Sequence, residues 1–275
     1  IGSTPDKFAQ KTVHYRSIVM EEYQEKIYEH YEEIEEEKEK IRIRMAKGKS
    51  KTDDNMSTYS TYTRQSCNFV FPTVGTRING EDRPRPGKFK IKEEEAAVLD
   101  EGKDKVVVTE LKKNKENKDY TDAINKYINN FIDYLKELLR KDKEKNNSLK
   151  NDVDKFYNKY NQSLSLFLKD EKNKSKLFEV LYSCSPKYIH IIFNLLKSKG
   201  PVLAYSNYVA MEGLQIFKIF LIFFGFSKFD EENSKDFKRN KPLDKNKNFL
   251  RFIEFHGGID STEREENRKI YNNKL

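Results

Sequence analysis

The chain has 275 residues, of which 36% are hydrophobic and 36% are charged, so it is poorer in apolar residues than an average globular domain. Two cysteines and four scattered histidines exclude a disulfide framework and a four-ligand metal site. The net charge of +8 is compatible with phosphate-carrying partners, either nucleic acid or nucleotide. A solvated lysine-rich surface explains that charge equally well, because 45 acidic residues are mixed among the 53 basic ones.

The longest apolar run, 213–226, is too short to cross a bilayer and contains Lys218. The start of the chain has no apolar segment with the anatomy of a signal peptide. We therefore expect a soluble, intracellular chain in a reducing compartment, with no membrane partner.

A short β-branched run at 14–20 is compatible with a strand, and the segment 20–47 that follows is predicted to be a long helix. Apolar residues recur along this helix every three to four positions and form one narrow stripe: Tyr23, Ile27, Tyr31 and Ile34. The stripe is too short for sustained coiled-coil heptads, so we expect the helix to lie across a neighbouring domain.

A short apolar segment at 62–72 ends in a proline, and the segment 73–95 is predicted to be a loop or linker. The lysine- and asparagine-rich part that follows contains two amphipathic patterns, 121–141 and 148–169, with Thr121 as the N-cap of the first. We interpret this part as a mainly helical, partly disordered insertion. Its basic outer face is typical of a solvated surface, and contact with nucleic acid is the alternative.

The last hundred residues alternate helix and strand, which predicts an α/β fold with parallel strands joined by right-handed crossovers. The first expected helix is at 185–200, with Ser185 as N-cap, Pro186 at its first position and Gly200 after its end. A buried strand at 201–208 and a helix at 210–226, ended by Gly225, follow it. The last two elements are a strand at 249–255 and a helix at 261–273 capped by Ser261 or Thr262.

Ligands bind parallel α/β sheets at the carboxyl ends of the strands. Ser206 and Asn207 follow the first expected strand, and Gly257 and Gly258 follow the second. Glycines permit positive φ and the close approach of another backbone, and the next helix offers free N–H groups to a phosphate that Arg264 would also reach. A tight turn with an ordinary helix cap remains the alternative at both positions.

These pieces, in this order, resemble the superfamily II helicases of the Swi/Snf-like branch, in the first part of their second RecA-like lobe. The resemblance rests on the following stretches: "IVMEEYQEKIY" at 18–28, "TRQSCNFVFP" at 63–72, "SPKYIHIIFNLLK" at 185–197, "PVLAYSNYV" at 201–209, "FIEFHGGIDSTERE" at 252–265 and "IYNN" at 270–273. The form "RQSCNFVFP" is most similar to the helicase-like ATPases of nucleocytoplasmic large DNA viruses, such as the poxvirus-type early transcription factor small subunit and nucleoside triphosphate phosphohydrolase I.

The resemblance implies a partial RecA-like C-terminal lobe with a long N-terminal helix and an insertion. It divides the chain into an initial strand, long helix and "RQSCNFVFP" element (1–72), a linker with a helical insertion (73–175), and the first half of the lobe (176–275). It also implies that Ser206, Asn207, Gly257, Gly258 and Arg264 face a nucleic-acid backbone. For Cys67 and Asn68 we expect a packing role.

The phosphate loop and acidic box of the first RecA-like lobe, and the arginine-finger motif, are not found in this sequence. The parent protein is therefore expected to use ATP and Mg²⁺, whereas this segment binds no cofactor alone and contains no catalytic residue and no metal site. The expected partners are nucleic acid (DNA in preference to RNA), the first RecA-like lobe and a viral transcription machinery. The expected location is the virion or the host cytoplasm.

Two other functions remain open on the sequence alone. One is a stand-alone basic nucleic-acid-binding protein, whose affinity would fall with salt. The other is a helical structural or interaction protein built on the helices at 20–47 and 121–169.

Overall fold

The computed structural model describes residues 12–46, 61–85, 89, 105–170, 174–229 and 250–272. The described part is mostly helical, with one small parallel sheet of two strands. In chain order its elements are α1 (Glu22–Ala46), α2 (Thr61–Ser66), α4 (Lys105–Glu144), α5 (Leu149–Asn158), α6 (Leu164–Lys169), α7 (Lys176–Cys184), α8 (Pro186–Lys197), α9 (Leu214–Phe223), β1 (Ser227–Lys228), β2 (Arg251–Phe252) and α11 (Ser261–Asn272).

The long N-terminal helix is confirmed as α1, and its predicted apolar stripe is its buried face. Ile27 and Tyr31 are buried against Val70, and the Tyr31 hydroxyl donates to the Gly80 carbonyl at 2.8 Å. The strand predicted at 14–20 is wrong, because this segment has no strand pairing and most of its side chains are exposed.

The "RQSCNFVFP" element forms α2 and then runs into the middle of the hydrophobic core. Phe69 is fully buried, and its ring centroid lies 5.5 Å from that of Phe131 on α4 and 5.8 Å from that of Phe220 on α9. The contacts of the two preceding residues agree with the expected packing role. Cys67 Sγ donates to the Thr63 carbonyl, and Asn68 Oδ1 accepts from Lys187 Nζ at 2.8 Å.

The helix predicted at 121–141 is the second half of the much longer α4. Thr121 is not an N-cap, because its hydroxyl donates to the Asn117 carbonyl one turn earlier within the helix. The second predicted helix, 148–169, is divided into α5 and α6 by Asn161 and Gln162, which both have positive φ. A single helix cannot pass through two such residues.

The predicted insertion shares one core with the segments on either side of it. Asp142 near the end of α4 accepts hydrogen bonds from the backbone N–H groups of Lys176 and Leu177, at the start of α7. The buried Asp152 of α5 accepts from both the N–H and the hydroxyl of Ser175, the N-cap of α7. The hydrophobic core includes residues from both sides of the predicted segment boundaries at 72/73 and 175/176. The division of the chain at these two positions stays a prediction.

The start of α8 agrees with the prediction, because the Ser185 hydroxyl accepts from the Tyr188 N–H and Pro186 is the first helical residue. The helix ends at Lys197, and Gly200 lies beyond its cap. Gly225 ends α9 in a left-handed conformation with φ +91°, while the Phe226 N–H donates to the Leu221 carbonyl. This pattern of bonds is a glycine-dependent helix stop.

The buried strand predicted at 201–208 is wrong: the segment is irregular, and Leu203 and Tyr205 are 78% and 84% exposed. A parallel strand does form within 249–255 as β2. Its partner is β1, which directly follows α9, with Ser227 opposite Arg251. The structure therefore shows a mostly helical body with a two-stranded parallel sheet, which is compatible with a partial α/β domain. The RecA-like lobe stays a prediction.

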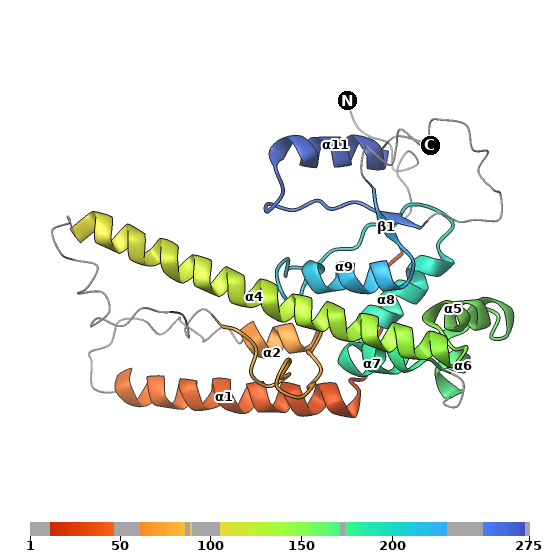
Figure 1. Ribbon diagram of the computed structural model, residues 1–275, viewed down its shortest axis with the longest axis horizontal. Coiled ribbons are helices and arrows are strands. Elements are labelled where there is room, and N and C mark those ends of the chain that lie inside the picture. Colours follow the sequence, from red (N-terminus) through yellow and green to blue (C-terminus); the bar gives the residue numbers. More distant parts are fainter. Residues whose placement is uncertain are drawn as a thin grey trace.

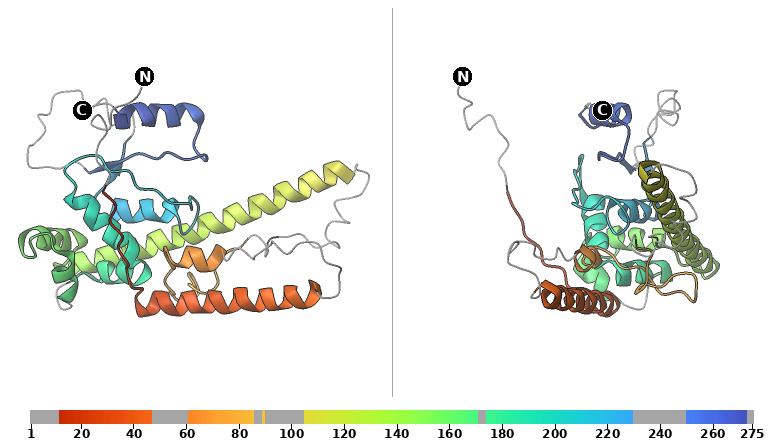
Figure 2. Two further views of the ribbon diagram at one scale, coloured as in Figure 1. Left: turned by 180° about the vertical axis from the view of Figure 1, so that it is seen from behind. Right: turned by 90° about the vertical axis from the view of Figure 1, so that its left-hand side faces the viewer.

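The helices are stacked in layers across the long axis of the molecule. Figure 1 shows α4 crossing its middle, with α1 and α2 on one side and α9, the small sheet and α11 on the other, and Figure 2 shows the same order from two further directions. The acidic helix α1 is thus far from α11. None of the described helices is both long enough and apolar enough to cross a membrane.

Candidate nucleic-acid interface

The first predicted site segment is an exposed stretch that ends in a tight turn. The Ser206 hydroxyl accepts a hydrogen bond from the Tyr208 N–H at 3.1 Å, and the Asn207 side chain accepts from the Tyr205 hydroxyl at 2.7 Å. Neither residue caps a helix, since α9 begins only at Leu214. Both polar side chains therefore lie in a loop on the surface, where a ligand can reach them.

The turn that follows, 208–213, has little conformational freedom. Met211 has φ +50°, a left-handed conformation that costs energy for a residue with a side chain. A Cβ atom on Gly213 would lie 2.1 Å from the Tyr208 carbonyl oxygen, so only glycine fits there. The chain then enters α9 with the Leu214 N–H donating to Tyr208 O at 3.0 Å.

The second predicted site segment contains the two glycines, and neither adopts a positive φ. The glycines therefore do not use the left-handed conformation that their residue type permits. Gly258 donates its N–H to His256 Nδ1 at 3.0 Å, and a Cβ atom there would lie 3.1 Å from the same ring nitrogen. Gly257 faces open space, with no atom within 4 Å of such a Cβ. The two glycines thus differ in role: Gly258 accommodates the histidine ring, and Gly257 leaves its backbone accessible.

The first turn of α11 is capped by Asp260, which directly precedes Ser261 and Thr262, the two alternatives predicted for the cap. The Asp260 carboxylate accepts from the Thr262 N–H at 2.7 Å. This backbone hydrogen bond holds the pKa of Asp260 below its ordinary value. The N-terminus of α11 is thus already satisfied by an internal anion, so a phosphate would have to compete with Asp260 for these N–H groups.

Arg264 lies one turn into α11, where its N–H donates to the Asp260 carbonyl at 3.0 Å. Its side chain is half-buried and makes no hydrogen bond or ion pair within the described part of the chain. Arg268, on the same helix, is paired with Glu265 at 2.6 Å. Of these two arginines, Arg264 is therefore the one available to an external anion.

A charge cluster centred on Glu254 attaches α11 to the small sheet and α9. Lys218 Nζ lies 3.2 Å from both Glu254 oxygens, and Lys228 Nζ lies 3.5 Å from one of them and 3.1 Å from Glu263. His256 Nε2 approaches Glu254 at 3.5 Å, and Asn267 of α11 donates to the Glu254 carbonyl at 2.8 Å. Two of the lysines near the predicted interface are thus neutralised internally.

The Glu254 cluster predicts a defined pH dependence of stability. Burial raises the pKa of Glu254, but the hydrogen bond and charge of Lys218, together with Lys228 and His256, outweigh it and leave the pKa below its ordinary value. A carboxyl group with a lowered folded pKa adds stability that is fully present above its unfolded pKa of about 4.3 and is lost as pH falls through the folded pKa.

We therefore expect Glu254→Gln to lower the melting temperature at neutral pH. The difference from the unsubstituted chain should shrink as pH falls below about 4.3. Circular dichroism melting curves of both proteins across this range measure that difference. A difference that grows on acidification would show that Glu254 does not hold its charged form in the folded state.

The two site segments lie on the same side of the molecule. In Figures 1 and 2 the segment 253–260 runs between α11 and the segment 201–213, which passes over α9. Among the residues that the structure describes, no hydrogen bond or ion pair connects Ser206 or Asn207 with the second site segment. The structure thus places the predicted residues in two neighbouring groups, and whether both contact one ligand stays a prediction.

Sequence reasoning missed Glu254, His256 and Asp260. A charged residue inside the apolar run "FIEF" was the available signal for Glu254, because an isolated carboxylate in such a run needs a partner. Asp260 was a possible cap by residue type, but three consecutive cap-forming residues at 260–262 left its role ambiguous.

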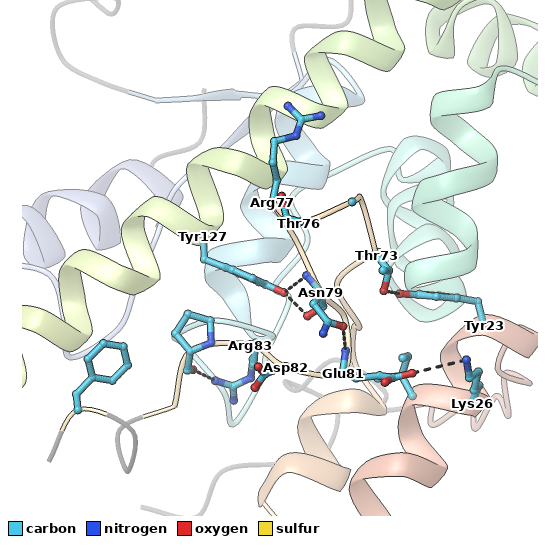
Figure 3. Close-up of a pocket in the computed structure, with 14 residues that line it drawn as sticks. Tyr23, Lys26, Thr73, Thr76, Arg77, Asn79, Glu81, Asp82, Arg83 and Tyr127 are labelled. Atoms are coloured by element: carbon cyan, nitrogen blue, oxygen red, sulfur yellow. Dashed lines mark hydrogen bonds and ion pairs between the residues drawn. The ribbon is translucent and has the colours of Figure 1, made fainter.

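A separate hollow of about 800 Å³ lies between α1, the loop 73–84 and α4. Figure 3 shows Tyr127 from α4 directed at the backbone of Asn79, whose carbonyl accepts from its hydroxyl at 2.5 Å, and Lys26 from α1 directed at Glu81. Basic and acidic side chains line this hollow together, so its charge does not select a ligand. Nor do any three His, Cys, Asp or Glu side chains of the described residues group as a metal site would require.

One known protein is similar to this chain over its whole length. A protein of Acanthamoeba polyphaga mimivirus, named "Putative ATP-dependent RNA helicase", is 36% identical over 277 aligned positions, which are all of this chain and 31% of that protein. The chain thus spans somewhat less than a third of the relative's length. No family model matches the chain, and no solved structure matches it. The comparison agrees with the expected resemblance to a viral helicase, and the poxvirus-type family stays a prediction.

Proposed function

We propose that this chain is part of a viral, ATP-dependent helicase or nucleoside triphosphatase that acts on nucleic acid. The observation that carries the proposal is the 36% identity of this whole chain to part of a mimivirus protein, which is named as a putative ATP-dependent RNA helicase. The order of the motif-like stretches, from "RQSCNFVFP" to "FHGGIDSTER", supports the same assignment. We further propose that the residues from 176 onward belong to a RecA-like lobe.

The geometry supports a backbone-contacting role for the two site segments. Ser206 and Asn207 offer a hydroxyl and an amide on the surface, Gly257 leaves its backbone open, and the Arg264 side chain has no internal acid. Such groups hydrogen-bond to phosphate and sugar without reading base sequence. We therefore propose contacts that are independent of sequence, as a translocating protein requires.

The chemistry of ATP hydrolysis needs groups that cradle the phosphates, bind Mg²⁺ and neutralise charge on the γ-phosphate. We propose that these groups belong to other parts of the longer protein, including a first RecA-like lobe, and that this segment contributes nucleic-acid contacts. A role in viral transcription, in the virion or the host cytoplasm, is part of the same proposal. The name of the mimivirus relative specifies RNA, whereas we expected DNA in preference to RNA, so both polymers belong in every assay.

Arg264→Ala in the longer protein is the direct test. Removing one phosphate contact should weaken binding to all sequences alike, and it should reduce the slope of log affinity against log salt by about 0.7 to 0.9. The measurement is a fluorescence anisotropy titration with single-stranded RNA and DNA at several salt concentrations. ATP hydrolysis stimulated by nucleic acid should fall in parallel.

Arg268→Ala is the matched control, because it removes an arginine from the same helix whose charge Glu265 already neutralises. Its salt slope should equal that of the unsubstituted protein. If both substitutions change the slope equally, the contribution of α11 is diffuse charge, and if neither does, Arg264 is not a phosphate contact.

A further inference from the structure

A buried ion pair fixes the rigid turn that follows the first site segment. Glu212, in the turn 208–213, and Arg83, in the loop after "RQSCNFVFP", are each 4% exposed, and Arg83 Nε is paired with Glu212 Oε1. The same guanidinium donates to Gln65 Oε1 at 2.7 Å and to the Pro84 carbonyl at 3.0 Å. Three acceptors therefore hold the plane of Arg83 in one orientation, which suits the planar fork of an arginine.

The backbone of the turn is held at Glu212 as well, by a residue of α8. The buried Tyr188 hydroxyl of α8 lies 2.7 Å from the Glu212 carbonyl and 3.0 Å from the Gly213 carbonyl. The turn is thus fixed through the Glu212 side chain by the loop and through its backbone by α8. The left-handed Met211 lies between these attachments and the surface residues Ser206 and Asn207.

A second arginine extends the cluster toward α1. Arg85 lies over the ring of Tyr62 at 3.7 Å from its centroid and over that of Tyr31 at 4.5 Å. Its Nη1 atom and Glu212 Oε2 are buried without a hydrogen-bond partner in the described part of the chain. The acidic group of the turn is therefore placed among cationic and aromatic groups that come from the N-terminal half of the chain.

A buried ion pair adds little net stability, since the cost of removing both charges from water offsets their attraction, whereas breaking one partner is costly. Such a pair can instead fix the relative positions of the two segments that carry its charged groups. We propose that Arg83 is a positioning residue: through Glu212 it holds the turn 208–213, and with it the orientation of Ser206 and Asn207. The loop 73–85 is thereby coupled mechanically to the nucleic-acid interface. The consequence for binding rests on the proposed function, while the coupling itself does not.

Hydrogen exchange of the full 275-residue chain tests the coupling without any ligand. In Arg83→Gln, the amides of Gly213, Leu214 and Gln215, which are bonded within the turn, should exchange at least about tenfold faster. The amides of Ile192 and Phe193 in α8 should keep their rates. Arg77→Gln is the matched control, because it removes an arginine of the same loop that pairs with the exposed Glu137 instead.

Arg83→Lys is the second variant in case the glutamine variant fails to fold. It keeps the charge but loses the planar fork, so the turn amides should exchange faster while α8 is unchanged. Equal acceleration in the turn and in α8, or none in either, would overturn the proposal, because the pair would then be an ordinary structural contact.

A binding titration in the longer protein separates this proposal from the proposed function. We expect Arg83→Lys to raise the dissociation constant for single-stranded nucleic acid several-fold, although Arg83 is buried and touches no ligand. If the turn loosens and affinity stays the same, the coupling stands and the assignment of Ser206 and Asn207 as contacts fails.

Discussion

Phe69→Ala is expected to lower the free energy of unfolding by about 3–5 kcal/mol, the range for truncating a fully buried phenylalanine. The Phe69 ring lies among four other aromatic rings, those of Phe71, Phe131, Tyr188 and Phe220. The substitution therefore leaves a cavity where three parts of the sequence meet. Urea unfolding followed by circular dichroism measures the loss.

Phe255→Ala serves as the control for Phe69→Ala, since this phenylalanine is 61% exposed and its removal should change stability by no more than about 0.5 kcal/mol. Comparable losses from the two substitutions would mean that the aromatic core does not centre on Phe69. A large loss from Phe69→Ala alone would show that the aromatic core depends on Phe69.

Gly213→Ala is expected to destabilise the chain by at least about 2 kcal/mol, because its new Cβ atom would overlap the Tyr208 carbonyl and force the backbone apart. Gly257→Ala offers a matched comparison, since the space around Gly257 is open. We expect that second change to stay within about 0.5 kcal/mol. Thermal unfolding of both variants measures the contrast.

The glycine comparison also separates structural from functional glycines. If Gly257→Ala leaves stability intact and weakens binding of nucleic acid, the open backbone at Gly257 is a contact. If Gly213→Ala is tolerated without loss of stability, the tight turn 208–213 is not formed as described, and the positioning role of Arg83 loses its basis.

Local signals predicted those elements whose ends are marked by unambiguous residues. Ser185 and Pro186 mark the start of α8, and Gly225 the end of α9, because each residue type suits one backbone position and few others. The stripe at Ile27 and Tyr31 predicted the buried face of α1 for the same reason: helical periodicity is a property of the segment itself.

Tertiary context decided where prediction failed. The run 201–208 is apolar enough for a buried strand, yet the described part of the chain provides no neighbouring strand for it, and Leu203 and Tyr205 remain exposed. A strand is stable only with a partner, which no local pattern reveals. Between Leu111 and Tyr120 the first half of α4 has no apolar residue, so periodicity gave no sign of a continuous helix before Thr121.

The sequence predicted where the candidate site lies, but not the contacts that hold its residues in place. The positions of Ser206, Asn207 and the glycine pair at the ends of apolar runs marked two exposed turns. The ion pairs that organise those turns join residues far apart in the chain, such as Arg83 with Glu212 and Lys218 with Glu254, and a single sequence does not reveal such long-range partners.

Hydrogen exchange of the longer protein with and without single-stranded RNA or DNA tests the central claim most directly. The account predicts that nucleic acid protects backbone amides in 205–209 and 256–264, and leaves those of α5 and α6 unchanged. Protection confined to other parts of the protein, with both segments exchanging as in the free state, would contradict the assignment of this surface as a nucleic-acid interface.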